Sequence, residues 1–367
     1  MRRALSLGAL AALAACATVG DGGAGDVGLP TTGVGPFRKL ESAEVPGIAP
    51  LVLDDKRAVF REPGALVRGA GGVDGPEVWL YAVAKDPASG KDVIVRSRAA
   101  DGRAFFGTSQ HGGRTPPIVL RPTEPWEGDA LSGPAPLEVD GTIYLYYAAK
   151  GGLGVARSTD GVTFTKEPGP ILARDRGVGF EIAELTGPSP MRLPGGGFRL
   201  FYAGGAGIGE AESADGVRFA RRDAQPDTPG VDPVLGTPFL SPGEPIPFDV
   251  GEVSDPHVMP RITAAGRLHV RVLYTGWSAA RGEASRASAI GFAARFGDRG
   301  PLERGGPVYA VNKEERAPTA VEWDGKTLLY VEQKKDGLGA DGYHAIAGAL
   351  APANLKLAAP AAFPDSP

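Results

Sequence analysis

The chain has few of the residues that build metal sites and disulfides. Its 367 residues include one cysteine and four histidines, and these are scattered, so the sequence gives neither a zinc-binding cluster nor a disulfide. The formal net charge is −4 and there is no block of basic residues, which leaves no electrostatic footprint for a nucleic acid. We therefore expect no nucleic-acid partner and no cofactor, and a structural cation is not indicated.

Helical periodicity is also missing, while turn-forming residues are abundant. The 55 glycines and 34 prolines make up about a quarter of the chain. Hydrophobic residues account for 42% of it and occur in regularly spaced clusters, enough to bury a core. Short runs rich in aromatic and aliphatic residues, separated by Gly, Pro and Asp-Gly, are typical of antiparallel strands joined by tight turns. The sequence therefore predicts an all-β fold.

The lone cysteine follows an apolar N-terminal segment. Residues 1–3 are Met-Arg-Arg, and residues 4–12 are apolar but too few to span a bilayer. The next residues, Leu-Ala-Ala-Cys at 13–16, resemble the lipobox of bacterial lipoproteins. In that family the cysteine is acylated and becomes the N-terminus after cleavage, so the resemblance implies lipidation of Cys16. The alternative is an ordinary signal peptide with an incidental cysteine.

This resemblance sets the expected organisation of the N-terminal part of the chain. Residues 1–15 would be the signal peptide, and the Gly-rich residues 16–35 a flexible tether. Because Ala17 rather than Asp follows the cysteine, the enterobacterial sorting rule implies the outer membrane. We expect a protein of the bacterial cell envelope, attached to the membrane through its lipid alone.

A strand pattern recurs five times along the chain. Each repeat opens with a strand near a proline, continues with an aromatic–aliphatic strand and a small-residue strand, and ends in a variable outer strand with a Pro-apolar signature. Asp-Gly turns follow the third strand in several copies. The opening prolines are Pro63, Pro134, Pro188, Pro256 and Pro318, and the aromatic–aliphatic strands are expected at 78–84, 142–149, 198–204, 268–276 and 327–333. Repeats of four strands predict the blades of a β-propeller.

The two ends of the repeated region complement each other. Residues 37–53 carry the signature of an outer strand without a blade of their own, whereas the fifth repeat ends soon after its third strand. We therefore expect a five-bladed propeller at 36–355 whose ring is closed by this N-terminal strand, followed by a C-terminal tail at 356–367. A β-sandwich of similar strands is the alternative. We expect the protein to be a monomer.

The connections that lead into the inner strands share an acidic pattern. An aromatic residue, a neighbouring acid and a proline recur with the same spacing, and the acids repeated in this way are expected to be structural: Glu127, Glu181 and Asp249. Acids that break the repeat are better candidates for function. Glu62 and Asp255 each stand directly before a proline, where the other blades have Gly or Ala.

The repeats resemble the five-bladed propeller glycoside hydrolases of the arabinanase, β-xylosidase and invertase clans. The resemblance extends over about residues 37–350 and is clearest in the second and third repeats. In that clan an acid precedes Pro in the first blade, a second acid lies in the second blade, and a Glu lies two residues before Pro in the third. Here Glu62 fills the first place and no acid flanks Pro134. Thr186 stands at the third place, with Glu184 two residues upstream.

The resemblance implies a carbohydrate ligand and hydrolysis of a glycosidic bond. Glycoside cleavage uses two carboxyl groups, one as acid and the other as base or nucleophile. By position we assign Glu62 as the base and Glu184 as the acid, with Asp255 tuning or binding. The residues expected to bind substrate are Arg61, Trp126, Phe180, His257, Trp277 and Arg316. The alternative is a non-catalytic propeller that binds a glycan or a protein at the cell surface.

Cys16 should be the first residue of the mature protein, because a lipobox-like segment precedes it and no other cysteine is present. Mass spectrometry of membrane-extracted protein should find no peptide from before Cys16 and should find acyl chains on it. A Cys16→Ser variant should be released from the membrane. A variant that stays membrane-bound and is still cleaved at this place would refute lipidation.

Overall fold

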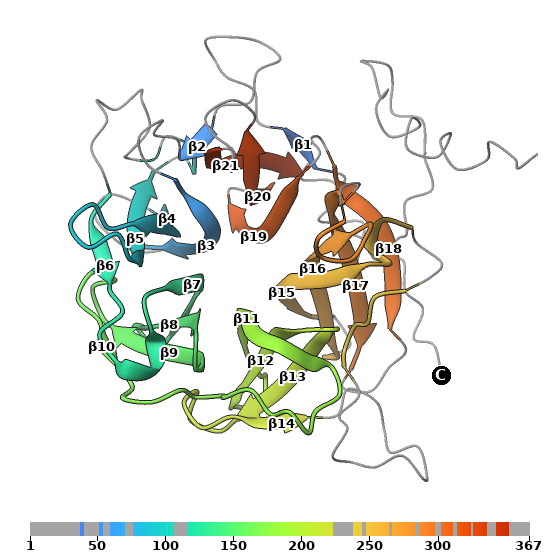
Figure 1. The fold of residues 1–367 in the computed structure, drawn as a ribbon, viewed down its shortest axis with the longest axis horizontal. Helices are drawn as coiled ribbons and strands as arrows, with labels where there is room; N and C mark the ends of the chain where they lie inside the picture. The colour runs from blue at the N-terminus through green and yellow to red at the C-terminus, as the bar shows by residue number, and fades with distance from the viewer. Residues whose placement is uncertain are drawn as a thin grey trace, which may run out of the picture.

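The computed structural model describes most of the repeated region of the chain. The described residues are 37–39, 51–53, 59–69, 76–100, 102–103, 105, 116–222, 238–243, 247–263, 266–283, 286–297, 302–310, 314–323, 326–335 and 343–351. They form five antiparallel sheets arranged in a ring, with the first strand of each sheet nearest the centre (Figure 1). The predicted all-β five-bladed propeller is therefore confirmed.

The strands follow the chain from the centre of each blade outwards. Blade 1 contains β3 (Arg61–Arg68), β4 (Glu77–Lys85), β5 (Asp92–Ala99) and β6 (Ile118–Leu120), and blade 2 contains β7 (Leu131–Val139), β8 (Thr142–Ala149), β9 (Gly152–Ser158) and β10 (Thr165–Lys166). Blade 3 contains β11 (Glu181–Arg192), β12 (Phe198–Gly205), β13 (Ile208–Ser213) and β14 (Ala220–Arg222). Blade 4 contains β15 (Glu252–Ile262), β16 (Leu268–Trp277), β17 (Ser288–Phe296) and β18 (Glu303–Tyr309). Short 3₁₀ turns, η2 (Pro125–Glu127) and η4 (Pro247–Asp249), precede β7 and β15.

Blade 5 is built from both ends of the described chain. Its inner strands are β19 (Glu315–Trp323), β20 (Lys326–Lys335) and β21 (Tyr343–Ala351), and β1 (Arg38–Lys39) and β2 (Leu51–Leu53) both pair antiparallel with β21. Arg38 lies opposite Leu350, and Leu51 lies opposite Ala347. These are the pairs expected for an N-terminal outer strand. That the ring depends on this segment for its closure stays a prediction.

The core lies between the blades. Residues 78–84 of β4 and residues 198–204 of β12 are buried without interruption, because a neighbouring blade covers each face of the strand. Five clusters of buried hydrophobic side chains fill the spaces between adjacent blades around the ring. When the second strand of a blade is buried on both faces, its sequence is a nearly continuous apolar run, and this is the pattern that the repeats show.

Tyrosines on the second strands of blades 1, 2 and 5 join each of these blades to a turn of the next. The hydroxyl of Tyr146 in blade 2 donates to the carbonyl of Gly216 in blade 3 at 2.9 Å, and Tyr330 in blade 5 donates to Gly102 in blade 1 at 2.7 Å. Gly216 has a φ of 79°, which favours glycine at this place in the turn. The predicted turns at Asp160-Gly161 and Asp215-Gly216 therefore exist, and they are structural, whereas Asp101 lies outside the described residues.

The repeated acids are also structural. Glu127, Glu181 and Asp249 are buried, and each accepts a hydrogen bond of 2.7–2.8 Å from a tyrosine hydroxyl of the second strand of its own blade. Each carboxylate also pairs with a cation from the outer strand of its blade, and these cations are Lys166, Arg221 and Arg304. A tyrosine hydroxyl and a cation together stabilise a carboxylate in a buried place that would otherwise disfavour its charge.

Several predicted features lie outside the described residues. These are Cys16, the signal peptide, the tether and the C-terminal tail. In the part of the chain that the structure describes, we find no helix of the length and apolar character needed to cross a membrane.

Deletion of residues 1–55 should destabilise the propeller, because it removes both strands that pair with the outer edge of β21. It also removes Phe37, which is buried in the cluster between blades 4 and 5. We expect the free energy of unfolding to fall by about 3 kcal/mol or more, as for the loss of one buried Phe. Urea unfolding followed by tryptophan fluorescence measures it.

Deletion of residues 1–20 alone is the matched control and should leave the unfolding midpoint unchanged. Equal midpoints for the two truncations would show that the ring does not depend on the N-terminal segment.

Candidate functional site

Every inner strand contains a residue in the left-handed backbone region directly before its proline. We call these five residues the collar: Glu62 (φ 49°), Gly133 (φ 54°), Gly187 (φ 55°), Asp255 (φ 49°) and Ala317 (φ 50°). A register shift at this place in each strand pair marks a bulge. The collar surrounds the channel where the five inner strands start.

The collar residues lie close to one another around the ring. A Cβ atom on Gly187 would lie 2.9 Å from the Cα of Asp255, and one on Gly133 would lie 3.1 Å from Pro188. Glycine is the residue that adopts a positive φ without strain, and a non-glycine residue there costs on the order of 1 kcal/mol. Glu62 and Asp255 are thus carboxylic acids in places where glycine would be more stable, which is typical of a functional constraint.

Two cavities meet at the collar. The mouth cavity, of about 320 Å³, lies where the inner strands begin, and the channel cavity, of about 470 Å³, follows the inner strands inwards. Both are lined by Glu62, Gly187, Asp255 and Ala317. The two acids of the collar therefore face a space that is open to a ligand from the mouth.

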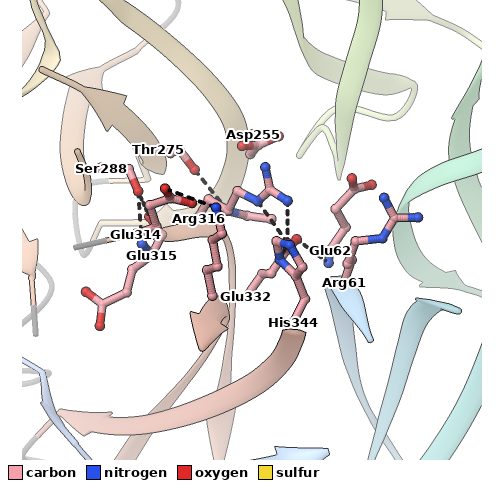
Figure 2. A network of polar contacts seen from close by, with 12 residues as sticks. Arg61, Glu62, Asp255, Thr275, Ser288, Glu314, Glu315, Arg316, Glu332 and His344 are labelled. Carbon is pink, nitrogen blue, oxygen red and sulfur yellow. Dashed lines mark hydrogen bonds and ion pairs between the residues drawn. The ribbon is translucent and has the colours of Figure 1, made fainter. Parts of the chain in front are cut away.

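Glu62 is held by hydrogen bonds to two neighbouring blades (Figure 2). Its backbone N–H donates to Glu332 Oε2 at 3.0 Å, and its own Oε2 accepts the Gly133 N–H at 2.6 Å. Burial, together with the nearby charges of Glu332 and Asp255, raises the pKa of Glu62 to about 7 against the opposing effects of Arg61 and of the Gly133 hydrogen bond. Glu62 is therefore largely protonated in slightly acidic solution.

Glu332 is a fully buried acid beneath this site. Arg316 donates to its Oε1 from Nε at 2.9 Å and from Nη2 at 2.5 Å, and His344 Nδ1 lies 2.6 Å from the same oxygen (Figure 2). Burial alone would raise the pKa of Glu332, but the contacts with His344 and Arg316 outweigh it and lower the pKa. Of the two neighbouring acids Glu332 and Glu62, Glu332 is thus the ionised one, and its negative charge favours the protonated form of Glu62.

Asp255 has a different environment from Glu62. Burial raises the pKa of Asp255, but the hydroxyl of Ser254, which donates to Oδ2 at 2.9 Å, and the charge of Arg316 both act against that rise. The two collar acids therefore differ in what surrounds them. Burial is the largest effect on the pKa of both acids, and two like charges add to it at Glu62, whereas a hydrogen-bond donor and a cation oppose it at Asp255, whose pKa is still raised.

The structure brings several of the predicted site residues together. Glu62, Asp255, Trp277 and Arg316 all line the mouth cavity. His257 lines the channel cavity, where its Nε2 lies 2.9 Å from the Ala320 carbonyl oxygen. Burial lowers the pKa of His257 to about 4, so the ring is neutral at physiological pH.

Two aromatic residues predicted to stack on a sugar lie elsewhere. Trp126 stacks on Tyr147 with ring centroids 6.0 Å apart, and Phe180 packs on Tyr202 at 5.9 Å, both within the blades. Neither lines the mouth or the channel cavity as the described residues define them. Each aromatic precedes a structural acid, so it belongs to the repeated support of the blade, and we no longer assign it to the substrate.

Glu184 and Arg61 also differ from the predicted arrangement. Glu184 is exposed and, among the described residues, is not part of either cavity lining. Arg61 pairs with Asp92 at 2.8 Å, so it acts on Glu62 through its charge and does not line the mouth cavity. The matched position in blade 4, Glu252, lines the mouth cavity and is bound by two arginines.

The loop that follows the second strand explains this difference between blades. In blade 3, β12 turns into β13 through residues 206 and 207, whereas in blade 4 residues 278–287 separate β16 from β17 and carry Arg281 and Arg286. These arginines hold Glu252 in the mouth, and the two-residue turn of blade 3 has no cation to hold Glu184. The lengths of the two connections were visible in the sequence and could have suggested the difference.

Glu332 and His344 belong to the site but were not predicted from the sequence. A signal for Glu332 was present, since an acid within the otherwise apolar strand 327–333 requires a partner once it is buried. Its partners come from three different strands, so they could not be read from the local sequence. In the described part of the chain, no group of three or more His, Cys, Asp or Glu side chains is placed to hold a metal ion.

The raised pKa of Glu62 predicts a specific pH dependence of stability. A carboxyl group whose folded-state pKa is raised from 4.5 to about 7 stabilises the fold fully below pH 4.5, and this stabilisation is lost as the pH rises to about 7. Glu62→Gln should therefore reduce the loss of unfolding free energy between pH 5 and pH 8 by up to about 3 kcal/mol. Urea unfolding of wild type and variant at the two pH values measures it.

The exposed Glu184 supplies the matched control for this experiment. Glu184→Gln should leave the pH dependence of the wild type in place. The same dependence in Glu62→Gln as in wild type would show that Glu62 does not carry it.

Comparison with known proteins supports the fold and leaves the family open. No protein-family model matches the chain, and no curated protein matches it in sequence. A Bacteroides ovatus protein assigned provisionally to the glycoside hydrolases matches in structure with a TM-score of 0.59 and 15% identity, covering 86% of this chain and 96% of its own. A family-43 β-xylosidase/α-arabinofuranosidase from a compost microbial metagenome, solved with xylotriose, matches with a TM-score of 0.51 and 16% identity, covering 85% and 94%.

An exo-1,5-α-L-arabinanase from a bovine ruminal metagenomic library matches with a TM-score of 0.51 and 12% identity, covering 79% of this chain and 92% of its own. The three structures span nearly the whole propeller of this chain. The chain therefore has the five-bladed fold of the glycoside hydrolase propellers, the fold that its repeats resemble.

Proposed function

We propose that the protein is a carbohydrate-active lipoprotein of the cell envelope that cleaves a glycosidic bond at the mouth of its propeller. The observation that carries this proposal is the pair Glu62 and Asp255, two acids at strained collar positions that face the same two cavities. The shared fold adds support, since one propeller of this fold was solved with xylotriose. Export and anchoring rest on the lipobox-like segment that ends at Cys16.

The environments of the two acids assign their roles. Glu62 has a pKa raised to about 7 and keeps its proton in slightly acidic solution, so it is suited to protonate the leaving-group oxygen. Burial raises the pKa of Asp255 as well, but the Ser254 hydroxyl and the charge of Arg316 oppose that rise, so of the two acids Asp255 is the one assigned as the carboxylate. This assignment replaces the one made from sequence position, in which Glu62 was the base and Glu184 the acid.

The backbone of blade 2 orients the proton donor. The Gly133 N–H donates to Oε2 of Glu62 at 2.6 Å, which leaves Oε1 as the oxygen available to carry the proton toward a ligand. Asp255 then acts either on a water molecule or directly on the anomeric carbon, and the spacing of the two carboxyl groups in the sugar complex decides which.

A second candidate function is binding of a glycan without cleavage. It is favoured by the collar itself, because blades 2 and 3 place glycines there and contribute no acid at those two positions. The same cavities and the same charged residues would then bind a sugar that is never cleaved.

Glu62→Gln should lower kcat for a cleaved glycoside by about 10²–10⁴-fold, because it removes the group that protonates the leaving oxygen. In the wild type, the rate should fall as the pH rises through about 7, where Glu62 loses its proton. Asp255→Asn should abolish turnover. A screen of aryl glycosides and polysaccharides followed by pH–rate profiles measures these effects.

Glu184→Gln is the control and should retain wild-type kcat. A loss of activity in Glu184→Gln that equals the loss in Glu62→Gln would restore the assignment from sequence position. Sugar binding by a wild type that cleaves no glycoside in the screen would favour the second candidate function.

A further inference from the structure

Three arginines line the mouth cavity beside the collar acids. Arg281 and Arg286 come from the loop between β16 and β17 in blade 4, and Arg316 comes from β19 in blade 5. The proposed chemistry of Glu62 and Asp255 does not require three guanidinium groups. Their presence together in one cavity of about 320 Å³ therefore indicates a separate role in binding the ligand.

The arginines are paired unevenly with acids, and the charge of Asp255, which lines the same cavity, also acts on Arg281 and Arg316. Arg281 and Arg286 share a single carboxylate, that of Glu252, with nitrogen–oxygen distances of 2.7 Å and 2.5 Å. The third guanidinium, on Arg316, is bound to the buried Glu332. Two cations on one carboxylate carry a net charge of +1, and they repel each other at close range.

The guanidinium groups retain donors that point to an acceptor-only partner. Arg286 Nε is buried and has no hydrogen-bond partner, and Arg286 uses only Nη2 toward Glu252 among the described residues. The side chain of Arg281 is 65% exposed and that of Arg316 is 31% exposed, so both can be reached from the mouth. A guanidinium offers five N–H donors, and a carboxylate is the acceptor that matches their planar geometry.

Trp277 fixes the arginines rather than a sugar ring. Its indole Nε1–H donates to the Ser254 hydroxyl at 3.2 Å, and the Arg286 guanidinium lies over its ring, 3.7 Å from the centroid. The aromatic face is therefore occupied by a cation. The loop is also closed by hydrogen bonds between residues 278 and 287, so the arginines are held before any ligand arrives.

We infer that the ligand is an acidic sugar, a uronate, whose carboxylate is bound by Arg281, Arg286 and Arg316 while its ring faces the collar acids. This inference rests on the proposed function and narrows it to one class of substrate. A neutral sugar has hydroxyl groups that also donate hydrogen bonds, whereas a carboxylate only accepts them. A carboxylate therefore fits the guanidinium groups of Arg281 and Arg316, whose side chains are exposed to the mouth.

Isothermal titration calorimetry tests the inference with four sugars on the whole protein. The acidic probes are D-galacturonate and D-glucuronate, each also tested as its 1,4-linked oligomers in the α and β forms. The neutral probes are D-galactose and D-glucose, each also tested as the corresponding oligomers. The uronates should bind at least about tenfold more tightly than their neutral counterparts, as expected for a charge-assisted hydrogen bond to each carboxylate. Their affinity should also weaken as salt is added.

Arg281→Ala is the variant of choice, because the exposed side chain of Arg281 carries little risk to folding. It should weaken uronate binding by about tenfold and leave the binding of neutral sugars unchanged. Arg157→Ala is the matched control, since Arg157 is an exposed arginine that pairs with a glutamate, Glu167, on the outer edge of blade 2. The control should change neither affinity.

The outcomes separate this inference from the proposed function. Binding or cleavage of neutral sugars that equals or exceeds that of uronates would overturn the inference and leave the proposed function standing. Uronate affinity unaffected by Arg281→Ala would also overturn it. Absence of binding and cleavage for every sugar would overturn both.

Discussion

A single buried carboxylate connects the last blade of the propeller to the first. Glu332 on β20 accepts from Arg316 on β19, lies against His344 on β21, and accepts the backbone N–H of Glu62 on β3. A buried charge that lost any of these partners would be strongly destabilising, because a carboxylate in the interior requires compensation for its lost hydration. The four strands are therefore held in one arrangement, and the position and the pKa of Glu62 both follow from it.

Around this junction the propeller repeats two devices that carry no chemistry of their own. One is the tyrosine that donates to a turn glycine of the next blade, as Tyr146 does to Gly216. The other is the buried acid that accepts from a tyrosine of its own blade and pairs with a cation of the outer strand, as Glu127 does with Tyr147 and Lys166. Because these contacts lie within the blades and between them, away from the collar, the collar positions can differ between blades without loss of the scaffold. Function arises where the symmetry is broken.

Acids and arginines lie close together in the mouth cavity, and the charge of each group changes the pKa of its neighbours. The charge of Glu332 favours the neutral form of Glu62, whereas the charge of Arg316 favours the ionised form of Asp255. In a low-dielectric cavity such effects are much larger than in water. The same arginines that tune the acids also retain donors toward the mouth, so tuning of the acids and recognition of a ligand share one set of residues.

The sequence by itself determined the architecture of this protein. Alternating turn signals, apolar second strands and repeated prolines are local features, and each blade satisfies its own backbone through neighbouring strands, so five repeats were enough to predict five blades. The sequence also singled out Glu62 and Asp255, because an acid before proline stands out where the equivalent residue is Gly or Ala.

Only the tertiary structure decided which residues share a site. Glu184 and Glu252 occupy matching places before their prolines, but only Glu252 lies in the mouth, because the loop of blade 4 brings Arg281 and Arg286 to it. Trp126 and Phe180 proved to be blade core, and the partners of Glu332 come from strands far apart in the chain. Local pattern fixes which strand a residue belongs to, whereas closure of the ring sets which side chains meet and which charges they experience.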